Sequence, residues 1–133
     1  MNVEVGGAAV PRLSRRAIAA FARRVLRACG TGSQPVHMAE LSIAFVHDAT
    51  MRALNRRFRR KDKTTDVLTF PDEIVISLDQ ARRQARDEKH SLATEVRYLI
   101  AHGVLHALGY DHETDEGEMN ALELVVRQRV GLE

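Results

Sequence analysis

The sequence has little of anything that would place it outside the ordinary globular proteins. Its 133 residues include one cysteine, Cys29, so an intramolecular disulfide is excluded. No apolar run is long enough to span a bilayer, and the first ten residues lack the apolar and basic character of a secretion signal. There is also no repeat, low-complexity tract or linker. We therefore expect one cytosolic domain over residues 1–133, without a membrane segment.

The net charge is small and aromatic side chains are few as well. The net charge is only +2, but residues 1–63 contain 13 basic and 4 acidic side chains, whereas residues 64–133 contain 7 and 14. This asymmetry predicts a basic surface for a polyanion without identifying the polyanion. Aromatic residues make up 5% of the chain, and only Phe58 lies in the densest basic run. We therefore expect recognition of phosphates and shape rather than base stacking.

Hydrophobic periodicity predicts an α+β fold in which a small mixed β-sheet packs with about five helices. Helices are expected at 14–29, from Asp48 to about Phe58, and at 79–88, 92–108 and 115–130; strands are expected at 41–46, 67–70 and 74–77. Asp48 is expected to cap its helix. Cys29 lies on the apolar stripe of the first helix, which predicts a packed core thiol.

Three of the six histidines lie within residues 102–112, HGVLHALGYDH. His102 and His106 are four residues apart on a predicted helix, so both imidazoles project from one face. Gly109 is expected to end that helix in the left-handed conformation, which turns the chain back and brings His112 to the same ion. Three imidazoles leave one position open, as in catalytic zinc sites. We expect one Zn²⁺ per chain, although the same ligands also suit nickel, copper and iron.

The histidine spacing matches the metallopeptidase pattern H-E-x-x-H-x-x-G-x-x-H except at Gly103, which replaces the general-base glutamate. Without that carboxylate beside the metal, peptide hydrolysis is not expected. Gly103 also removes a side chain beside the open coordination position. We hypothesise that the space admits a bulky group such as a phosphodiester.

The segment H-G-x-L-H-x-x-G-Y-D-H resembles the signature of the YbeY family of rRNA-maturation endoribonucleases. Other segments are similar to that family in order and spacing, namely 54–59 (LNRRFR), 65–71 (TDVLTFP) and 74–77 (IVIS). The chain departs from the family pattern at Thr64, where proline is usual, and at Asp72-Glu73, where Gly-Asp is usual. The loop after Pro71 is also much shorter, so substrate contacts from that loop are not expected.

The resemblance implies a metalloprotease-like α+β architecture with zinc on His102, His106 and His112. It implies a single-strand-specific endoribonuclease acting at the 3′ end of small-subunit (16S) rRNA, with roles in ribosome assembly and quality control. The implied partners are rRNA, the small ribosomal subunit and assembly proteins. The resemblance also singles out Arg59 as a catalytic residue, since a guanidinium beside the metal can hold the scissile phosphate and stabilise its developing charge.

Residues 52–63, RALNRRFRRKDK, carry seven basic side chains and one acid. Many such runs are simply solvated helix faces. Beside a candidate hydrolytic site, however, phosphate contacts that give salt-dependent and sequence-independent affinity are the better interpretation. The side chains expected to contact RNA phosphates are Arg56, Arg57, Arg59, Arg60, Lys61 and Lys63.

Three acidic residues are candidates for hydrogen bonds around the metal ligands. Asp66 either caps a turn or orients Arg59 or a ligand histidine. Asp111 precedes His112, and Glu95 shares a helical face with His102.

No residue is a convincing general base for phosphodiester cleavage. Either a zinc-activated water attacks the phosphorus, since zinc lowers the pKa of its water to about 7, or the RNA 2′-hydroxyl attacks. Two alternative functions stay open. In one the protein is a non-catalytic ribosome-assembly factor whose metal rigidifies the fold, and in the other, disfavoured by Gly103, it is a peptidase.

Overall fold

A mixed four-stranded sheet forms the centre of the fold. The computed structural model describes residues 2–30, 40–110 and 116–132. Within them lie four strands, β1 (Asn2–Gly7), β2 (Glu40–Val46), β3 (Val67–Phe70) and β4 (Glu73–Ser77), and five helices, α1 (Arg15–Cys29), α2 (Asp48–Arg59), α3 (Leu78–Glu88), α4 (Leu92–Ala107) and α5 (Glu118–Arg129). The predicted α+β class is confirmed.

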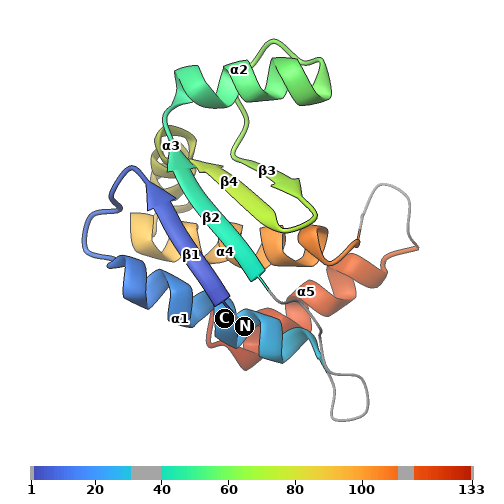
Figure 1. Cartoon of the computed structure of the whole chain (residues 1–133). Coiled ribbons are helices and arrows are strands. Elements are labelled where there is room, and N and C mark those ends of the chain that lie inside the picture. The colour runs from blue at the N-terminus through green and yellow to red at the C-terminus, as the bar shows by residue number, and fades with distance from the viewer. Residues whose placement is uncertain (1, 31–39, 111–115, 133) are drawn as a thin grey trace.

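The strands lie in the order β1-β2-β4-β3, with β1, β2 and β4 parallel and β3 antiparallel to β4 (Figure 1). The sequence analysis did not predict β1, which pairs with β2 and forms one edge of the sheet. β3 forms the other edge and is only four residues long. The short β3 lies between α2 and α4, the two helices that carry most of the expected functional residues (Figure 1).

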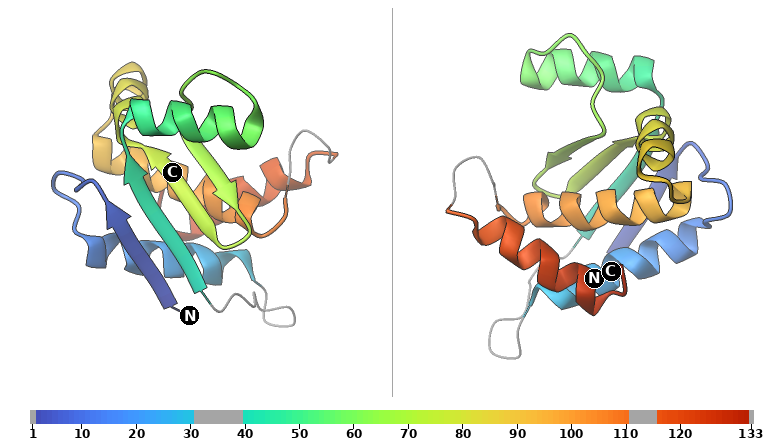
Figure 2. Two further views of the ribbon diagram at one scale, coloured as in Figure 1. Left: turned by 45° about the horizontal axis from the view of Figure 1, so that its top comes forward. Right: turned by 180° about the vertical axis from the view of Figure 1, so that it is seen from behind.

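The two faces of the sheet are covered unequally. Alternate residues of β2, Leu41, Ile43 and Phe45, are buried in the main core against α1 and α4. In the view from behind, α4 runs across this face with α1 and α5 beside it (Figure 2). On the opposite face α2 covers the sheet through Met51, which packs with Leu68 and Val75. The histidines and the arginines therefore come from opposite sides of the sheet.

Helix α1 begins as the sequence predicts. The Ser14 hydroxyl accepts a hydrogen bond from the Ala17 amide at 3.1 Å, which satisfies one exposed donor of the first turn. At the other end Cys29 packs against the main core. Burial raises the pKa of the Cys29 thiol to about 11, against a smaller opposing effect of Arg129, so the thiol stays protonated at neutral pH. Cys29 packs against the core as predicted, but it is half-buried rather than inside the core.

The expected helix cap at Asp48 is wrong, because Asp48 is the first residue of α2 itself. Its carboxylate instead accepts hydrogen bonds from the Thr64 and Ser77 hydroxyls, both at 2.9 Å, and pairs with Arg83 at 2.8 Å. Its backbone amide donates to the Asp79 carboxylate at 2.9 Å. Carboxylates from α2 and α3 thus tie the first turns of both helices together. No described helix has the length and apolar character needed to cross a membrane.

Candidate metal centre and basic surface

His102 and His106 lie together near the C-terminal end of α4. Their Nε2 atoms are 3.1 Å apart, and the rings are inclined by 72° with centroids 4.7 Å apart. Two zinc–nitrogen bonds of about 2.05 Å at a tetrahedral angle would place the nitrogens about 3.3 Å apart. The two imidazoles therefore fit one zinc ion with little adjustment, as the helical spacing predicts.

The chain turns sharply directly after these histidines. The Gly109 amide donates to the His106 carbonyl at 2.9 Å, and the Tyr110 amide donates to the Leu105 carbonyl at 3.1 Å. Gly109 has a φ of 102°, a left-handed conformation that only glycine adopts cheaply, as predicted. His112 and Asp111, the third expected ligand and its neighbour, lie outside the described residues. Among the residues described, no group of three His, Cys, Asp or Glu side chains is placed to hold a metal.

A glutamate from α5 contacts the first histidine. The Nδ1 atom of His102 lies 2.6 Å from Oε1 of Glu123, whose side chain is about 10% exposed. Glu95, a candidate for such a contact from the sequence, does not make it. The structure pairs Glu95 with His90 at 2.7 Å. Seven residues of helix rise about 10.5 Å, too far for Glu95 to reach His102 along one face.

The pKa of the Glu123 carboxyl lies below its ordinary value. Burial alone would raise it, but the hydrogen bond from His102 and the electrostatic effects of His102, Arg127 and His106 outweigh burial. Glu123 is thus ionised at neutral pH. An ionised carboxylate on Nδ1 favours the tautomer in which Nδ1 carries the proton and Nε2 presents its lone pair.

A hollow of about 280 Å³ lies beside His102, between α4 and α5. It is lined by His102, Met119, Asn120 and Glu123. The hollow gives a substrate group room to approach the imidazole from the α5 side.

Gly103 does not open space at the metal, so that hypothesis is wrong. It is buried where α4 meets the sheet, and a Cβ atom there would lie 2.9 Å from Cγ2 of Ile74. The missing side chain therefore lets α4 approach β4 closely. Replacing Gly103 by leucine would disturb this packing and would not test substrate access.

Arg59, the last residue of α2, reaches the free edge of β3. Because the Ser77 amide donates to the Asp66 carbonyl, the ladder alternation turns the Thr69 carbonyl away from β4. Arg59 donates to that carbonyl through Nη2 at 3.2 Å. Arg59 is otherwise exposed, so its remaining N–H groups can face a ligand at the edge of the sheet.

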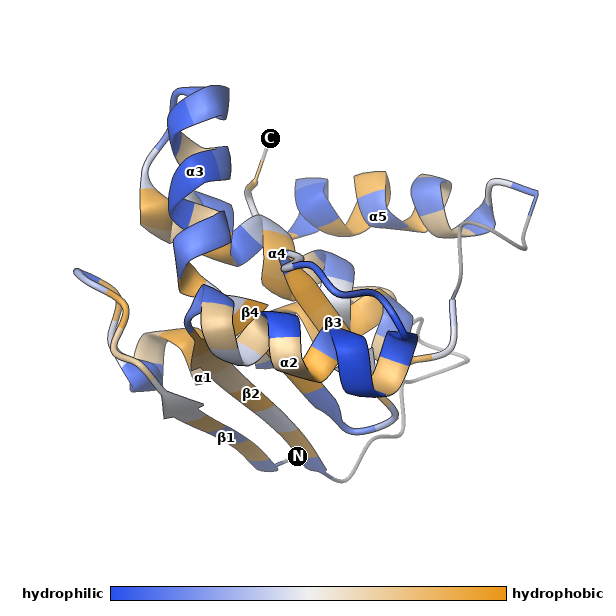
Figure 3. Cartoon of the chain, turned by 90° about the horizontal axis from the view of Figure 1, so that it is seen from above, coloured by the Kyte–Doolittle hydropathy of each residue, from blue (hydrophilic) through white to orange (hydrophobic). Residues whose placement is uncertain are grey.

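The rest of the expected phosphate-binding set is solvent-exposed and concentrated at the end of α2 and in the segment that follows it. Arg56, Arg57, Arg60, Lys61 and Lys63 are all exposed. In Figure 3 the C-terminal end of α2 and the segment that follows it are coloured mostly as hydrophilic. Asp62 neutralises part of the charge, since it pairs with Arg52 at 2.8 Å and lies 3.7 Å from Arg56. Because Asp62 pairs with Arg52 and Arg56, it leaves the basic side chains next to Arg59 unneutralised.

Phe58 is 49% exposed within this basic surface. Its ring contacts Phe70 of β3 edge to face, with centroids 5.4 Å apart, and the Arg57 guanidinium lies 5.2 Å from its centroid. One aromatic ring is thus available near Arg59, as the sequence analysis noted.

The comparisons with known proteins identify the family. The family model described as Endoribonuclease YbeY matches residues 9–131. The chain belongs to the YbeY endoribonuclease family. It is 44% identical over 126 residues to the Endoribonuclease YbeY of Solibacter usitatus, covering 90% of this chain and 82% of the relative. It is 42% identical over 127 residues to that of Koribacter versatilis, covering 90% and 80%.

A solved structure supports the fold. The solution structure of TM1509 from Thermotoga maritima matches with a TM-score of 0.64 over 97% of this chain and 89% of that chain. The two sequences are 24% identical, so this likeness speaks for the architecture alone.

Relative to the YbeY family pattern, the shortened connection after Pro71 is a tight turn in the structure. Only Pro71 and Asp72 separate β3 from β4. The edge strand is therefore bounded by a turn too short to reach across the site, as the shortened sequence implied.

Asp66 fills the turn role rather than the orienting role. Its carboxylate accepts from the Val67 amide at 2.8 Å and from Nε2 of Gln84 at 3.2 Å. Among the described contacts of Asp66, none is with Arg59 or with a ligand histidine.

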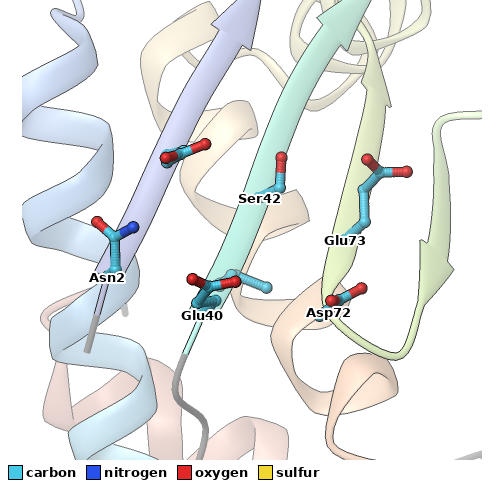
Figure 4. A pocket seen from close by; sticks show the side chains of 7 residues that line it. Asn2, Glu40, Ser42, Asp72 and Glu73 are labelled. Atoms are coloured by element: carbon cyan, nitrogen blue, oxygen red, sulfur yellow. The ribbon is translucent and has the colours of Figure 1, made fainter.

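Acidic side chains gather in a second hollow, at the N-terminal ends of the parallel strands β1, β2 and β4. Figure 4 shows Glu40, Ser42 and Glu73 projecting from β2 and β4 beside Asn2 and Asp72. This hollow has a volume of about 160 Å³ and also includes Glu4. Glu73 pairs with Phe70, the neighbour of Thr69, so acidic and basic side chains both flank the β3–β4 hairpin.

Proposed function

We propose that this YbeY-family protein is a zinc-dependent endoribonuclease acting on single-stranded segments of small-subunit rRNA in the cytoplasm. Its proposed role is maturation of the rRNA 3′ end during ribosome assembly, together with assembly proteins. The proposed metal ligands are His102, His106 and His112. The observation that carries the proposal is the convergence of two Nε2 atoms 3.1 Å apart, beside an edge strand that holds an exposed arginine.

The metal ligands and the basic helix meet around β3. Helix α4 packs against β3 from one side of the sheet. Arg59 arrives from the other side and is held by the Thr69 carbonyl. RNA lying along this edge would meet the histidines and the guanidinium together.

Each group of residues has a separate task. The histidines hold the ion, which when bound supplies a Lewis acid and an activated water near neutral pH. Arg59 binds the scissile phosphate and stabilises charge on its oxygens. Arg56, Arg57, Arg60, Lys61 and Lys63 contact neighbouring phosphates and set the salt dependence of binding.

The test compares metal content and RNA cleavage for wild type, His106→Ala and Arg59→Ala. We expect wild type to hold about one zinc per chain and to cleave RNA. His106→Ala should lose both properties, whereas Arg59→Ala should keep zinc and lose cleavage. Wild-type protein that holds zinc but cleaves no RNA would favour the non-catalytic assembly role.

The ends of the product RNA identify the attacking group. A 2′,3′-cyclic phosphate shows attack by the RNA 2′-hydroxyl, and a 5′-phosphate paired with a 3′-hydroxyl shows attack by water. In the first case no protein group need activate a water.

A further inference from the structure

We propose that Glu123 and Arg127 of α5 form a positioning pair that fixes the tautomer and orientation of His102, and so sets the affinity of the site for zinc. The inference rests on the proposed zinc site and assigns a role to two residues outside the histidine motif. Glu123 contacts His102 directly, at 2.6 Å. Arg127 acts through Glu123.

Both oxygens of the Glu123 carboxylate are used. Oε1 contacts Nδ1 of His102, and Oε2 accepts a hydrogen bond from Nη2 of Arg127. A carboxylate occupied on both sides cannot swing toward the metal without breaking one of these contacts. Glu123 is therefore a positioning residue rather than the missing general base or a fourth ligand.

Arg127 is itself held in place by aromatic packing. Its guanidinium carbon lies 4.8 Å from the centroid of the Tyr98 ring, and the Tyr98 hydroxyl donates to the Leu132 carbonyl at 2.5 Å. The Nε atom of Arg127 is buried with no hydrogen-bond partner among the described residues, an arrangement that costs free energy. The contacts with Glu123 and Tyr98 compensate for that cost and anchor the pair.

Helix α4 offers a matched control. Glu95, in the first turn of α4, is as buried as Glu123, and its Oε1 lies 2.7 Å from Nε2 of His90. This second Glu–His pair has the same chemistry but its histidine is outside the proposed ligand set. A general loss of stability from removing a buried carboxylate would appear in both pairs, whereas a positioning effect appears only at Glu123.

The experiment measures zinc affinity by chelator competition for wild type, Glu123→Gln, Arg127→Met and Glu95→Gln. Glu123→Gln should weaken zinc binding about 10- to 100-fold, the usual loss when the group orienting a ligand histidine is removed. Arg127→Met should weaken it less, and Glu95→Gln should leave it within about twofold of wild type. The absorption spectrum of the cobalt(II)-substituted protein should change more in Glu123→Gln than in the other variants.

Wild-type affinity in a folded Glu123→Gln, or an equal loss in Glu95→Gln, overturns the positioning role while leaving the zinc site intact. Wild-type protein that binds no metal overturns the zinc site and the inference together. Should Glu123→Gln fail to fold, nitrogen NMR of metal-free wild-type protein decides. His102 should be protonated on Nδ1, and a proton on Nε2 instead overturns the inference.

Discussion

The two sides of the β3 edge are built in contrasting ways. On the α4 side, His102 contacts a carboxylate that is about 10% exposed, and the helix is packed so closely on the sheet that Gly103 has no room for a Cβ atom. On the α2 side, the expected RNA-binding side chains are exposed, and the helix has a small core of its own around Met51. One side is fixed by packing and the other is presented to solvent.

The contrast suggests a division between chemistry and capture. Metal ligands need fixed geometry, which buried hydrogen bonds and close packing supply. Phosphate contacts need charge and reach, and exposed arginine and lysine side chains supply both without a rigid frame. Substitutions should therefore have large, local effects on the α4 side and smaller, additive, salt-dependent effects on the α2 side.

The largest effect is expected for His106→Ala. Loss of one of the three proposed ligands should reduce zinc affinity by at least about 100-fold, more than the loss of an orienting group. Zinc analysis after gel filtration, with RNA cleavage on the same sample, measures the effect. His47→Ala is the control, since its ring contacts Asp79 of α3 instead. Full zinc occupancy in His106→Ala would contradict the proposal that the α4 side holds the metal.

The next effect is expected for Arg59→Lys. The substitution keeps the charge but loses the planar fork, so cleavage should fall about 10- to 100-fold while zinc content stays at the wild-type level. Single-turnover cleavage at saturating protein separates this loss from weaker RNA binding. Unchanged cleavage would show that the bond from Arg59 to the Thr69 carbonyl serves the sheet edge alone.

A smaller, purely electrostatic effect is expected for the double variant Lys61→Gln/Lys63→Gln. Two lost phosphate contacts should reduce the slope of log affinity against log salt by about 1.4 for single-stranded RNA, whatever its sequence. Filter binding at several salt concentrations measures the slope. Arg16→Gln/Arg27→Gln, which removes two exposed charges from α1, should leave it unchanged. Equal losses in both variants would mean that the α2 side is not a distinct RNA surface.

Sequence reasoning predicted the parts of this site that depend on local spacing. Residues four apart on a helix must share a face, so His102 and His106 could be paired from the sequence alone. The turn at Gly109 follows from the conformational freedom of glycine. The exposed basic end of α2 follows from seven basic side chains with few apolar neighbours.

Contacts between segments that are distant in the sequence could not be predicted from the sequence. Glu123 reaches His102 from another helix, and no periodicity within α4 could reveal a partner 21 residues away. β1 offers only the alternation of Val3 and Val5 before two glycines, and its strand character depends on pairing with β2. The role of Gly103 depends on Ile74 of the sheet below it.

The start of α2 should also be sensitive to acid. Burial alone would raise the pKa of Asp48, but hydrogen bonds from Arg83, Ser77 and Thr64 and the Arg83 charge outweigh burial and hold it below its ordinary value. A lowered folded-state pKa means that Asp48 contributes stability above the unfolded pKa of about 3.9, and loses that contribution as pH falls through the folded value.

Asp48→Asn should therefore lower the free energy of unfolding by about 1 kcal/mol at neutral pH, since the group is partly exposed, and by less below about pH 4. Urea unfolding at several pH values measures both numbers. Asp62→Asn removes an exposed carboxylate from the same region and should change stability too little to detect. If Asp48→Asn lowers the free energy of unfolding equally at every pH, the stabilising contribution of Asp48 comes from its packing and not from its charge.

The smallest effect is expected for Phe58→Leu, which probes the one exposed ring on the α2 side. Leucine keeps apolar contact with Phe70 but removes the face on which a base can stack. If RNA binding depends on phosphate contacts, RNA affinity should fall no more than about threefold and the salt slope should not change. Loss of a stacked base, which is worth about 1–3 kcal/mol, would lower the affinity further than that. Fluorescence titration of a short labelled RNA with metal-free protein measures both. A loss beyond tenfold, reversed by Phe58→Trp, would show instead that the α2 side positions a base as firmly as the α4 side positions an ion.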